Sequence, residues 1–213
     1  MEQEKASTRE RLIASAVRLF GEKGIAATSM RALTEAAEAN IASVNYHFGS
    51  KEGLLRAVID QTMRAVNDER RRRLDDLESA AGPPSVAELV RAFVEPAADL
   101  TAHDGPDGSD TARFIGRLIG EPDPRVREIF AEQVGPVEGR YLAALGRALP
   151  ALGDERVRFA FTCMVGLLGL HQTGAFRTVD WRPRDTPPAR RPHPVEREEL
   201  VAFITGGMLA NLP

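Results

Sequence analysis

Apolar residues recur every three to four positions along most of the chain, which is the spacing of amphipathic helices. The first such segment opens with a capping-box pattern, Ser7 followed by Glu10, and is expected to end at Gly24. A longer segment begins after Ser50 and keeps its apolar positions as far as Leu77. We therefore predict a short first helix and a long helix over about residues 51–80.

The second half of the chain also reads as helices. After the break at Gly82-Pro83-Pro84, helices are predicted to begin near Ser85, Asp110, Asp123, Asp154 and Val195. Pro96 is expected to kink or end the first of these. Segments 103–110 and 178–195 are rich in Gly, Pro and charged residues and are predicted to be loops. No segment alternates as a strand does, so the predicted fold class is all-α, with about nine helices.

Residues 28–51, TSMRALTEAAEANIASVNYHFGSK, predict two short helices joined by a tight turn. Thr28 is placed to cap the first helix and Asn40 the second, because both side chains can accept hydrogen bonds from free backbone N–H groups. An apolar face on the first helix is expected from Leu33, Ala36 and Ala37.

The second of these helices, over about residues 41–48, has two different faces. The inward face is predicted to consist of Ile41, Val44 and Phe48. The outward face is predicted to consist of Ala42, Ser43, Tyr46 and His47, with Asn45 on the flank. That outward face is small, polar and aromatic, and a helix of this size fits the DNA major groove. We therefore predict a helix-turn-helix that binds double-stranded operator DNA.

The segment from Thr8 to Leu55 resembles the N-terminal domain of the tetracycline-repressor (TetR) family of one-component bacterial regulators. The matching features are LF-x-x-x-G at 19–24, Thr28, Ala36-Ala37, the YHF triplet at 46–48 and the following SKEGLL. Glu38 departs from the glycine that the family usually has in the turn. A residue with a side chain must take the left-handed conformation there at some cost, or change the turn.

The resemblance implies that Tyr46 contacts a DNA phosphate, and a similar role is expected of His47. Lys51 lies in the first turn of the next helix, where the helix dipole disfavours a cation, so a nearby phosphate would explain it. Ser43 and Asn45 are the candidates for contacts with base edges. The predicted DNA-binding residues are Thr28, Arg31, Asn40, Ala42, Ser43, Asn45, Tyr46, His47 and Lys51.

Two groups of arginines allow alternative interpretations. Arg31 either reaches a phosphate or pairs with Glu35 one turn later. The run from Arg70 to Arg73 is followed by acidic residues, which favours an ion-paired, solvated helix surface over a phosphate-binding patch.

Composition adds few constraints. The chain has 213 residues, a net charge of −3, 43% hydrophobic and 28% charged residues, which is ordinary for a globular protein. Residues 1–56 hold eight Lys and Arg against seven Glu, so the DNA-binding signal is local rather than a global basic field. The charged N-terminus has no apolar signal segment, and the longest apolar run, Phe159 to Leu170, is too short to span a bilayer. We expect a cytoplasmic protein without a membrane partner.

The resemblance implies two functional regions. Residues 1–50 would form the DNA-binding domain, linked by helix 51–80 to a domain of residues 81–213 that binds an effector and dimerises. The homodimer is expected to form through helices 154–174 and 196–211, because helix 154–174 is apolar on almost every side. The single cysteine of the chain, Cys163, is interpreted as a small buried apolar residue, with a redox sensor as the alternative. The segment ARFIGRLIGEP at 112–122, together with Tyr141, resembles a family branch that responds to fatty acids and related lipophilic effectors.

A pocket for such an effector is expected among the helices of the second domain. Its candidate walls are Phe93, Phe114, Leu118, Phe130, Tyr141, Met164 and Trp181, each of which can also be plain core. The candidate polar groups are Arg117, Tyr141 and His171. Arg117 either binds a carboxylate or pairs with Glu121 four positions later.

No catalytic constellation is visible in the sequence. The four histidines, His47, His103, His171 and His193, lie far apart and lack metal-ligand spacing, so neither a metal nor a cofactor is expected. We predict a homodimeric regulator that represses transcription and is released by a small lipophilic effector. The alternative is a helical protein-interaction module or a divergent all-helical enzyme.

Overall fold

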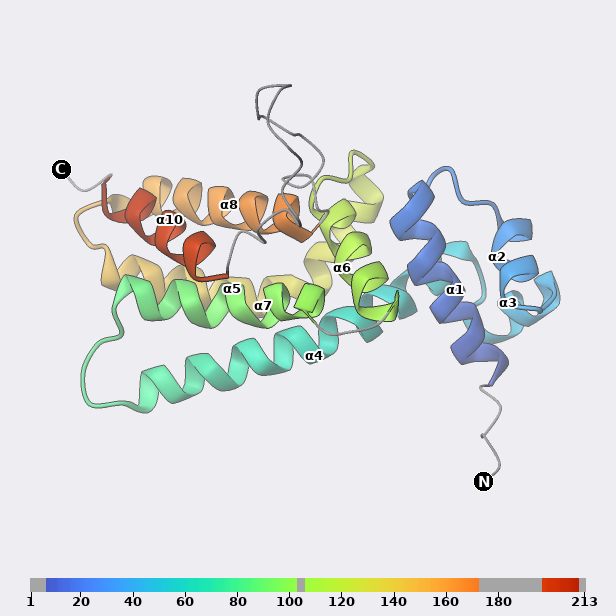
Figure 1. Ribbon diagram of the computed structural model, residues 1–213, viewed down its shortest axis with the longest axis horizontal. Coiled ribbons are helices and arrows are strands. Elements are labelled where there is room, and N and C mark those ends of the chain that lie inside the picture. The colour runs from blue at the N-terminus through green and yellow to red at the C-terminus, as the bar shows by residue number, and fades with distance from the viewer. Residues whose placement is uncertain (1–6, 103–105, 173–196, 211–213) are drawn as a thin grey trace, which may run out of the picture.

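The structure is a computed structural model that describes residues 7–102, 106–172 and 197–210, and within these ranges it contains nine helices and no strand (Figure 1). The helices are α1 (Thr8–Lys23), α2 (Met30–Ala36), α3 (Ile41–Phe48), α4 (Lys51–Ser79), α5 (Val86–Ala102), α6 (Pro106–Ile119), α7 (Pro124–Ala148), α8 (Gly153–Gln172) and α10 (Arg197–Leu209). The predicted all-α class is confirmed.

Helices α1, α2 and α3 gather at one end of the molecule as a small unit, called here the N-terminal unit (Figure 1). The capping box at the start of α1 is present: the Glu10 N–H donates to Ser7 Oγ at 3.3 Å, and the Ser7 N–H donates to the Glu10 carboxylate at 2.8 Å. The apolar side chains of Leu12, Phe20 and Leu33 in this unit are fully buried. Their burial supplies most of the force that holds three short helices together.

Helix α4 runs as one uninterrupted helix of 29 residues from the N-terminal unit to the far end of the larger helical layer (Figure 1). It packs on α1 and α3 near its start and on α5 and α7 along the rest of its length. Leu54 near its first turn and Leu74 near its last are both fully buried. This helix therefore contributes to the apolar core along most of its length.

The remaining helices form the larger part, in which α5 touches α4, α6, α7, α8 and α10. Pro96 lies inside α5 without ending it. The loop predicted over 103–110 is wrong from Pro106 onward, because α6 begins there. Proline is tolerated in the first turn of a helix, where the N–H it lacks would have no partner. Residues 103–105 and the loop predicted over 178–195, with Trp181, lie outside the described residues.

Helix α6 also touches the N-terminal unit, because it packs against α1. The rings of Phe20 in α1 and Phe114 in α6 lie 6.0 Å apart. A Cβ atom on Gly21 would come within 3.2 Å of the Asp110 carbonyl oxygen and 3.3 Å of the Phe114 nitrogen. The glycine therefore permits a close approach of the two helices. No helix in the described part of the chain combines the length and apolar character needed to cross a bilayer.

The contact between α3 and α4 is tight enough to be tested with one methyl group. A Cβ atom on Gly53 would overlap the Phe48 carbonyl oxygen and lie 3.0 Å from its carbonyl carbon. Gly53→Ala is therefore expected to lower the free energy of unfolding by about 1–3 kcal/mol, because backbone must move. Gly139→Ala in α7, with open space around the new methyl group, is the matched control and should be neutral or stabilising by up to about 1 kcal/mol. Urea denaturation of both variants measures this, and equal stability of the two would contradict the packing described.

Candidate nucleic-acid interface and effector cavity

The boundaries of α3 are set by its flanking residues. Asn40 Oδ1 accepts hydrogen bonds from the Ser43 N–H at 2.8 Å and from the Ser43 hydroxyl at 3.1 Å, which confirms the predicted cap. Gly49 follows the helix with φ 74°, and its N–H donates to the Asn45 carbonyl oxygen at 3.0 Å. Only glycine takes such a conformation without strain. The helix is thus fixed at both ends by local chemistry.

The outward face of α3 is open to solvent as predicted. Tyr46 is 85% exposed, and its ring lies 4.9 Å from that of His47 in an edge-on arrangement. Ala42, Asn45 and His47 are also exposed, while Ser43 is half-buried. The exposed groups offer hydrogen-bond donors, acceptors and ring faces, and none is a carboxylate.

The inward face of α3 differs from the prediction at one position. Val44 is fully buried and Phe48 is half-buried, but Ile41 is 54% exposed. Ile41 is the first helical residue and projects from the end of the helix, where no neighbouring helix covers it. The end of α2 also differs from the prediction: Leu33 and Ala37 are buried, but Ala36 is exposed.

The turn between α2 and α3 accommodates Glu38 in the left-handed conformation, with φ 48°. The next residue, Ala39, donates its N–H to the Thr34 carbonyl oxygen at 2.9 Å, as in a Schellman motif. The turn is therefore kept, and a non-glycine residue in this conformation costs about 1–2 kcal/mol.

The prediction for Thr28 is wrong. Helix α2 is capped by Ser29, whose Oγ accepts a hydrogen bond from the Ala32 N–H at 3.1 Å. Thr28 is fully buried, and its hydroxyl lies 2.7 Å from the Gly24 carbonyl oxygen and 3.2 Å from that of Leu19. The side chain therefore holds the connection between α1 and α2 and is not available to DNA.

Lys51 has a structural contact that the sequence did not reveal. Its Nζ donates to the Ile25 carbonyl oxygen at 2.7 Å, and partial burial lowers the pKa of its ammonium group. The contact fastens the start of α4 to the segment between α1 and α2. Arg31 is exposed on α2, and among the described residues no ion pair joins it to Glu35. Phosphate contacts by Lys51 and Arg31 remain predictions.

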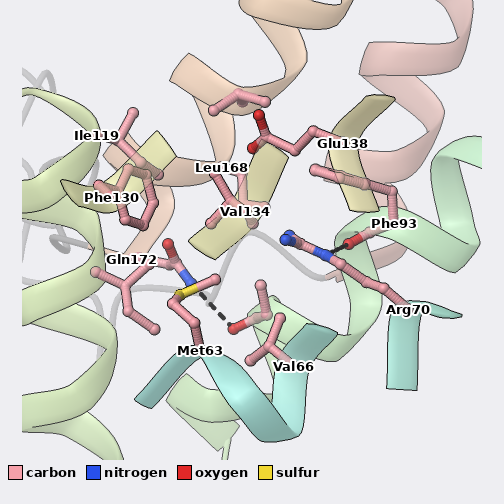
Figure 2. Close-up of a pocket in the computed structure, with 13 residues that line it drawn as sticks. Met63, Val66, Arg70, Phe93, Ile119, Phe130, Val134, Glu138, Leu168 and Gln172 are labelled. Carbon is pink, nitrogen blue, oxygen red and sulfur yellow. Dashed lines mark hydrogen bonds between the residues drawn. The ribbon is translucent and has the colours of Figure 1, made fainter. Parts of the chain in front are cut away.

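A cavity lies in the larger part of the molecule, between α4, α5, α6, α7 and α8 (Figure 2). It is lined by Met63, Val66, Arg70, Phe93, Ala97, Ile115, Ile119, Phe130, Val134, Glu138, Val165, Leu168 and Gln172. Its volume is about 20 Å³, which is room for a water molecule only. In this conformation the walls are therefore closed on one another.

Of the predicted lining residues, Phe93 and Phe130 lie on the cavity wall. The predicted residues that do not line it are Phe114, Leu118, Tyr141, Met164 and His171. Phe114 packs toward α1, and the Tyr141 hydroxyl donates to the Arg70 carbonyl oxygen at 2.8 Å. Leu118 and Met164 are buried elsewhere in the core. These corrections arise because the rotation of each helix decides which of its apolar residues reach the cavity.

Neither interpretation of Arg117 is correct. Its guanidinium group donates to the carbonyl oxygens of Gly21 at 2.5 Å and Glu22 at 2.9 Å, in the last turn of α1. Carbonyl groups at a helix C-terminus lack backbone partners and attract a cation. Arg117 therefore joins α6 to the N-terminal unit. Since Ile115 and Ile119 of the same helix line the cavity, α6 links the cavity wall to α1.

The polar residues of the cavity are Arg70, Glu138 and Gln172, and the sequence analysis missed all three. Arg70 was placed in an ion-paired surface run. That interpretation holds for Arg72, which pairs with Glu69 at 2.7 Å and Asp76 at 2.8 Å, but Arg70 is only 3% exposed. Helical periodicity contained the signal, because Arg70 is in phase with the buried positions 63, 66 and 74.

The described part of α8 and α10 exposes large apolar side chains in the single chain. Phe159 is 69% exposed and Phe203 is 70% exposed, and Leu170 and Leu209 are nearly half exposed. Cys163 is also exposed, which contradicts its interpretation as a buried residue of the chain's own core. Helix α8 therefore has apolar side chains that are not covered within the chain.

Two family models match the chain. The model described as "Bacterial regulatory proteins, tetR family" matches residues 12–58, and that described as "Tetracyclin repressor-like, C-terminal domain" matches residues 91–207. The first covers α2 and α3 with most of α1 and the start of α4. The second covers most of the larger helical part, including the helices around the cavity other than α4.

The chain is also similar to individual transcriptional regulators. The chain is 27% identical over 127 residues to the probable HTH-type transcriptional regulator YttP of Bacillus subtilis (strain 168), covering 60% of this chain and 58% of that protein. It is 26% identical over 134 residues to the HTH-type transcriptional dual regulator CecR of Shigella flexneri, covering 61% and 59%. The matches thus span about three fifths of either relative's length.

Solved structures share the fold over nearly the whole chain. The fatty acid degradation regulator FadR from Bacillus halodurans aligns with a TM-score of 0.62 at 16% identity, covering 99% of this chain and 97% of that one. A TetR-family transcriptional regulator from Bordetella parapertussis 12822 aligns with a TM-score of 0.62 at 17% identity, covering 96% and 95%. At these identities the likeness concerns the fold alone.

The contact between Arg117 and α1 can be tested by removing its donors. Arg117→Met is expected to speed amide hydrogen exchange in the last turn of α1 and to lower the free energy of unfolding by about 1–3 kcal/mol. Arg127→Met on α7, at an exposed arginine, removes the same charge as a control. Native-state hydrogen exchange distinguishes the two, and unchanged exchange in α1 of Arg117→Met would show that this contact does not hold the helix.

Proposed function

The chain belongs to the tetracycline-repressor family of bacterial regulatory proteins, and from this premise we propose that it is a ligand-responsive transcriptional repressor that binds a pseudo-palindromic operator as a homodimer. The observation that carries the proposal is α3, a capped helix backed by a buried core, whose outer face exposes Asn45, Tyr46 and His47. A rigid helix with an exposed polar face is what base reading in the major groove requires.

The DNA contacts follow from the position of each side chain on α3. Tyr46 is 85% exposed and is assigned to a phosphate, where a hydroxyl positions the protein without reading sequence. Asn45 is exposed and Ser43 half-exposed on the same helix, and both are assigned to base edges. Since the N-terminal segment is only slightly basic, geometry rather than net charge provides the specificity.

The homodimer is supported by the uncovered side of α8 and α10. Phe159, Leu170 and Phe203 form apolar surface that a single chain leaves in water. A two-fold axis through these helices would bury the same surface on both chains and leave two α3 helices to read two half-sites. Half-sites one helical turn apart require the two helices to be about 34 Å apart, or a multiple of it.

The response to an effector is supported by the position of the cavity. Its walls include α4 and α6, and both of these helices contact the N-terminal unit. Because the cavity is closed, a ligand enters only if these walls separate from α7 and α8. A ligand that prefers the opened arrangement shifts the population toward it, and the spacing of the two α3 helices changes. The mainly apolar walls favour a lipophilic effector.

The alternatives are a helical protein-interaction module and a divergent helical enzyme. One experiment separates them from a regulator: retardation of the DNA upstream of the gene that encodes this chain, in the presence of excess unrelated DNA. A regulator retards this fragment specifically. Loss of the retarded band in competitor DNA would favour a protein-interaction module. It would also contradict the proposal that the chain binds the DNA upstream of its own gene specifically.

The assigned DNA contacts predict two kinds of defect. Tyr46→Ala is expected to weaken binding to every sequence to a similar extent, because a phosphate contact carries no sequence information. Asn45→Ala is expected to relax discrimination at particular base pairs by roughly 1–3 kcal/mol. Fluorescence anisotropy with operator and substituted operator measures both, with Arg127→Met as the control. If both α3 variants bound like the parent, α3 would not be the reading helix.

The dimer prediction uses exposed rather than internally packed positions. Gly169 of α8 is unsuitable for such a test, because a Cβ atom at this position would lie 3.0–3.2 Å from Ile119 of the same chain. Phe203→Asp and Phe159→Asp are expected to shift the chain toward monomer at micromolar concentration, because an unpaired charge would be buried between the chains. Ala143→Asp, at an exposed position of α7, is the control. Sedimentation velocity decides: a parent chain that is already monomeric at this concentration contradicts the proposal.

A further inference from the structure

The cavity contains one buried cation whose outer donors lack a partner. Arg70 of α4 donates from Nε to the Phe93 carbonyl oxygen at 2.9 Å, and its guanidinium group lies 3.7 Å from the centre of the Phe93 ring. The two terminal nitrogens make no hydrogen bond within the described structure, and Figure 2 shows them turned into the cavity. An arginine that is 3% exposed, with a free fork of donors, is costly unless an anion meets it.

Two acceptors face the same space. Glu138 of α7 lies across the cavity from Arg70 (Figure 2), yet no ion pair joins the two in the described part of the chain. Gln172 of α8 donates from Nε2 to the Ala97 carbonyl oxygen at 3.2 Å, and its Oε1 is buried without a hydrogen-bond partner. Three polar side chains therefore line the same cavity: Arg70 from α4, Glu138 from α7 and Gln172 from α8.

Resting on the proposed function, we propose that the effector is an amphipathic monocarboxylic acid whose carboxyl group enters this cavity, binds Arg70 and shares one proton with Glu138. The apolar part of the acid lies against the walls formed by α5, α6 and α8.

The positive charge of Arg70 favours an acid over an amide or an amine as the ligand. A carboxylate matches the flat fork of a guanidinium group, whereas an amide leaves the charge of Arg70 without a counter-ion and an amine would be repelled by it. Burial lowers the pKa of Arg70 to about 10, so the group is still protonated at neutral pH. The cation that the acid needs is therefore present throughout the neutral range.

A proton is needed because the carboxyl group of the ligand lies beside that of Glu138. Two carboxylates that share one small site cannot both ionise, so binding an acid beside Glu138 leaves a single proton between them. Burial already raises the pKa of Glu138 above its ordinary value, although the charge of Arg70 opposes this. Above that pKa, Glu138 of the free protein is ionised, and binding must take one proton from solution.

Among the residues that the structure describes, no titratable group other than Arg70 and Glu138 lines the cavity. Helix α5 contributes Phe93 and Ala97, α6 contributes Ile115 and Ile119, and α8 contributes Val165, Leu168 and Gln172. From α4, Met63 and Val66 accompany Arg70, and from α7, Phe130 and Val134 accompany Glu138. Proton uptake on binding is therefore attributable to the pair formed by Glu138 and the ligand.

The location of the two charged residues also explains how an acid would act on the fold. Arg70 belongs to α4 and Glu138 to α7, and the closed cavity leaves room for a water molecule only. A carboxyl group inserted between them must increase the separation of α4 from α7. Since α4 continues into the N-terminal unit, the head group of the effector acts on the helix that carries the DNA-reading surface.

Calorimetric titration with octanoate and octanamide, on the full chain, tests the assignment. Above the pKa of Glu138, octanoate is expected to bind with an uptake that approaches one proton, measured in two buffers of different ionisation enthalpy, and about tenfold more weakly for each further pH unit. Octanamide is expected to bind at least about tenfold more weakly than octanoate at pH 6, without proton uptake, because it brings no charge to Arg70.

Variants assign the effect to residues. Glu138→Gln keeps the shape of the side chain and should bind octanoate with no proton uptake and no pH dependence. Glu128→Gln, at an exposed position of the same helix, should behave as the parent. Arg70→Gln should bind octanoate at least about tenfold more weakly. Circular dichroism checks that Arg70→Gln is folded, and if it is not, the Glu138→Gln result alone decides.

Three results would overturn the inference: no binding of octanoate at any pH, binding without proton uptake by the parent, or binding of octanamide as tight as that of octanoate. The failure of the proposed function looks different. In that case the unliganded chain does not bind operator DNA, whatever octanoate does. Release of operator by octanamide or octylamine, but not by octanoate, would leave a ligand-responsive regulator whose effector is not an acid.

Discussion

The organisation of the molecule depends on the continuity of α4. Its first turns pack in the N-terminal unit, where Leu54 and Val58 are fully buried, and its middle lines the cavity through Met63 and Arg70. An unbroken ladder of backbone hydrogen bonds makes the helix stiff, and at 1.5 Å per residue Arg70 lies roughly 28 Å along it from Lys51. A movement of this helix at the cavity therefore cannot be absorbed locally and reaches the reading surface.

A second connection prevents the N-terminal unit from simply following α4. Helix α6 holds α1 through Arg117, through the contact of Phe20 with Phe114, and through the close approach at Gly21. The same helix lines the cavity. The N-terminal unit is thus attached to two walls of one cavity, so a ligand that separates these walls changes its orientation rather than only loosening it. On the proposed function, this arrangement makes the cavity of about 20 Å³ the control point for the spacing of the two α3 helices in a dimer.

Local features of the structure were predictable from the sequence, and long-range ones were not. The capping box of α1, the Asn40 cap and the exposed face of α3 follow from side chains within four residues of each other. Ser29 and Thr28 are adjacent residues that can both cap a helix. In the fold Thr28 is buried and Ser29 is the cap. Periodicity shows that a helix has an apolar side, but not which neighbour covers it. For this reason Phe114 and Arg117 were assigned to the cavity although they face α1.

The central claim is that a ligand in the cavity changes the separation of the two N-terminal units of a dimer. Pulsed electron–electron resonance between spin labels at Glu35→Cys, an exposed position on α2, measures that separation in a Cys163→Ser background. With operator DNA, the account predicts a narrow distance distribution that suits half-sites about 34 Å apart or a multiple of that spacing. Saturating octanoate should shift the distribution and release the DNA. An identical distribution with and without bound octanoate would contradict the account.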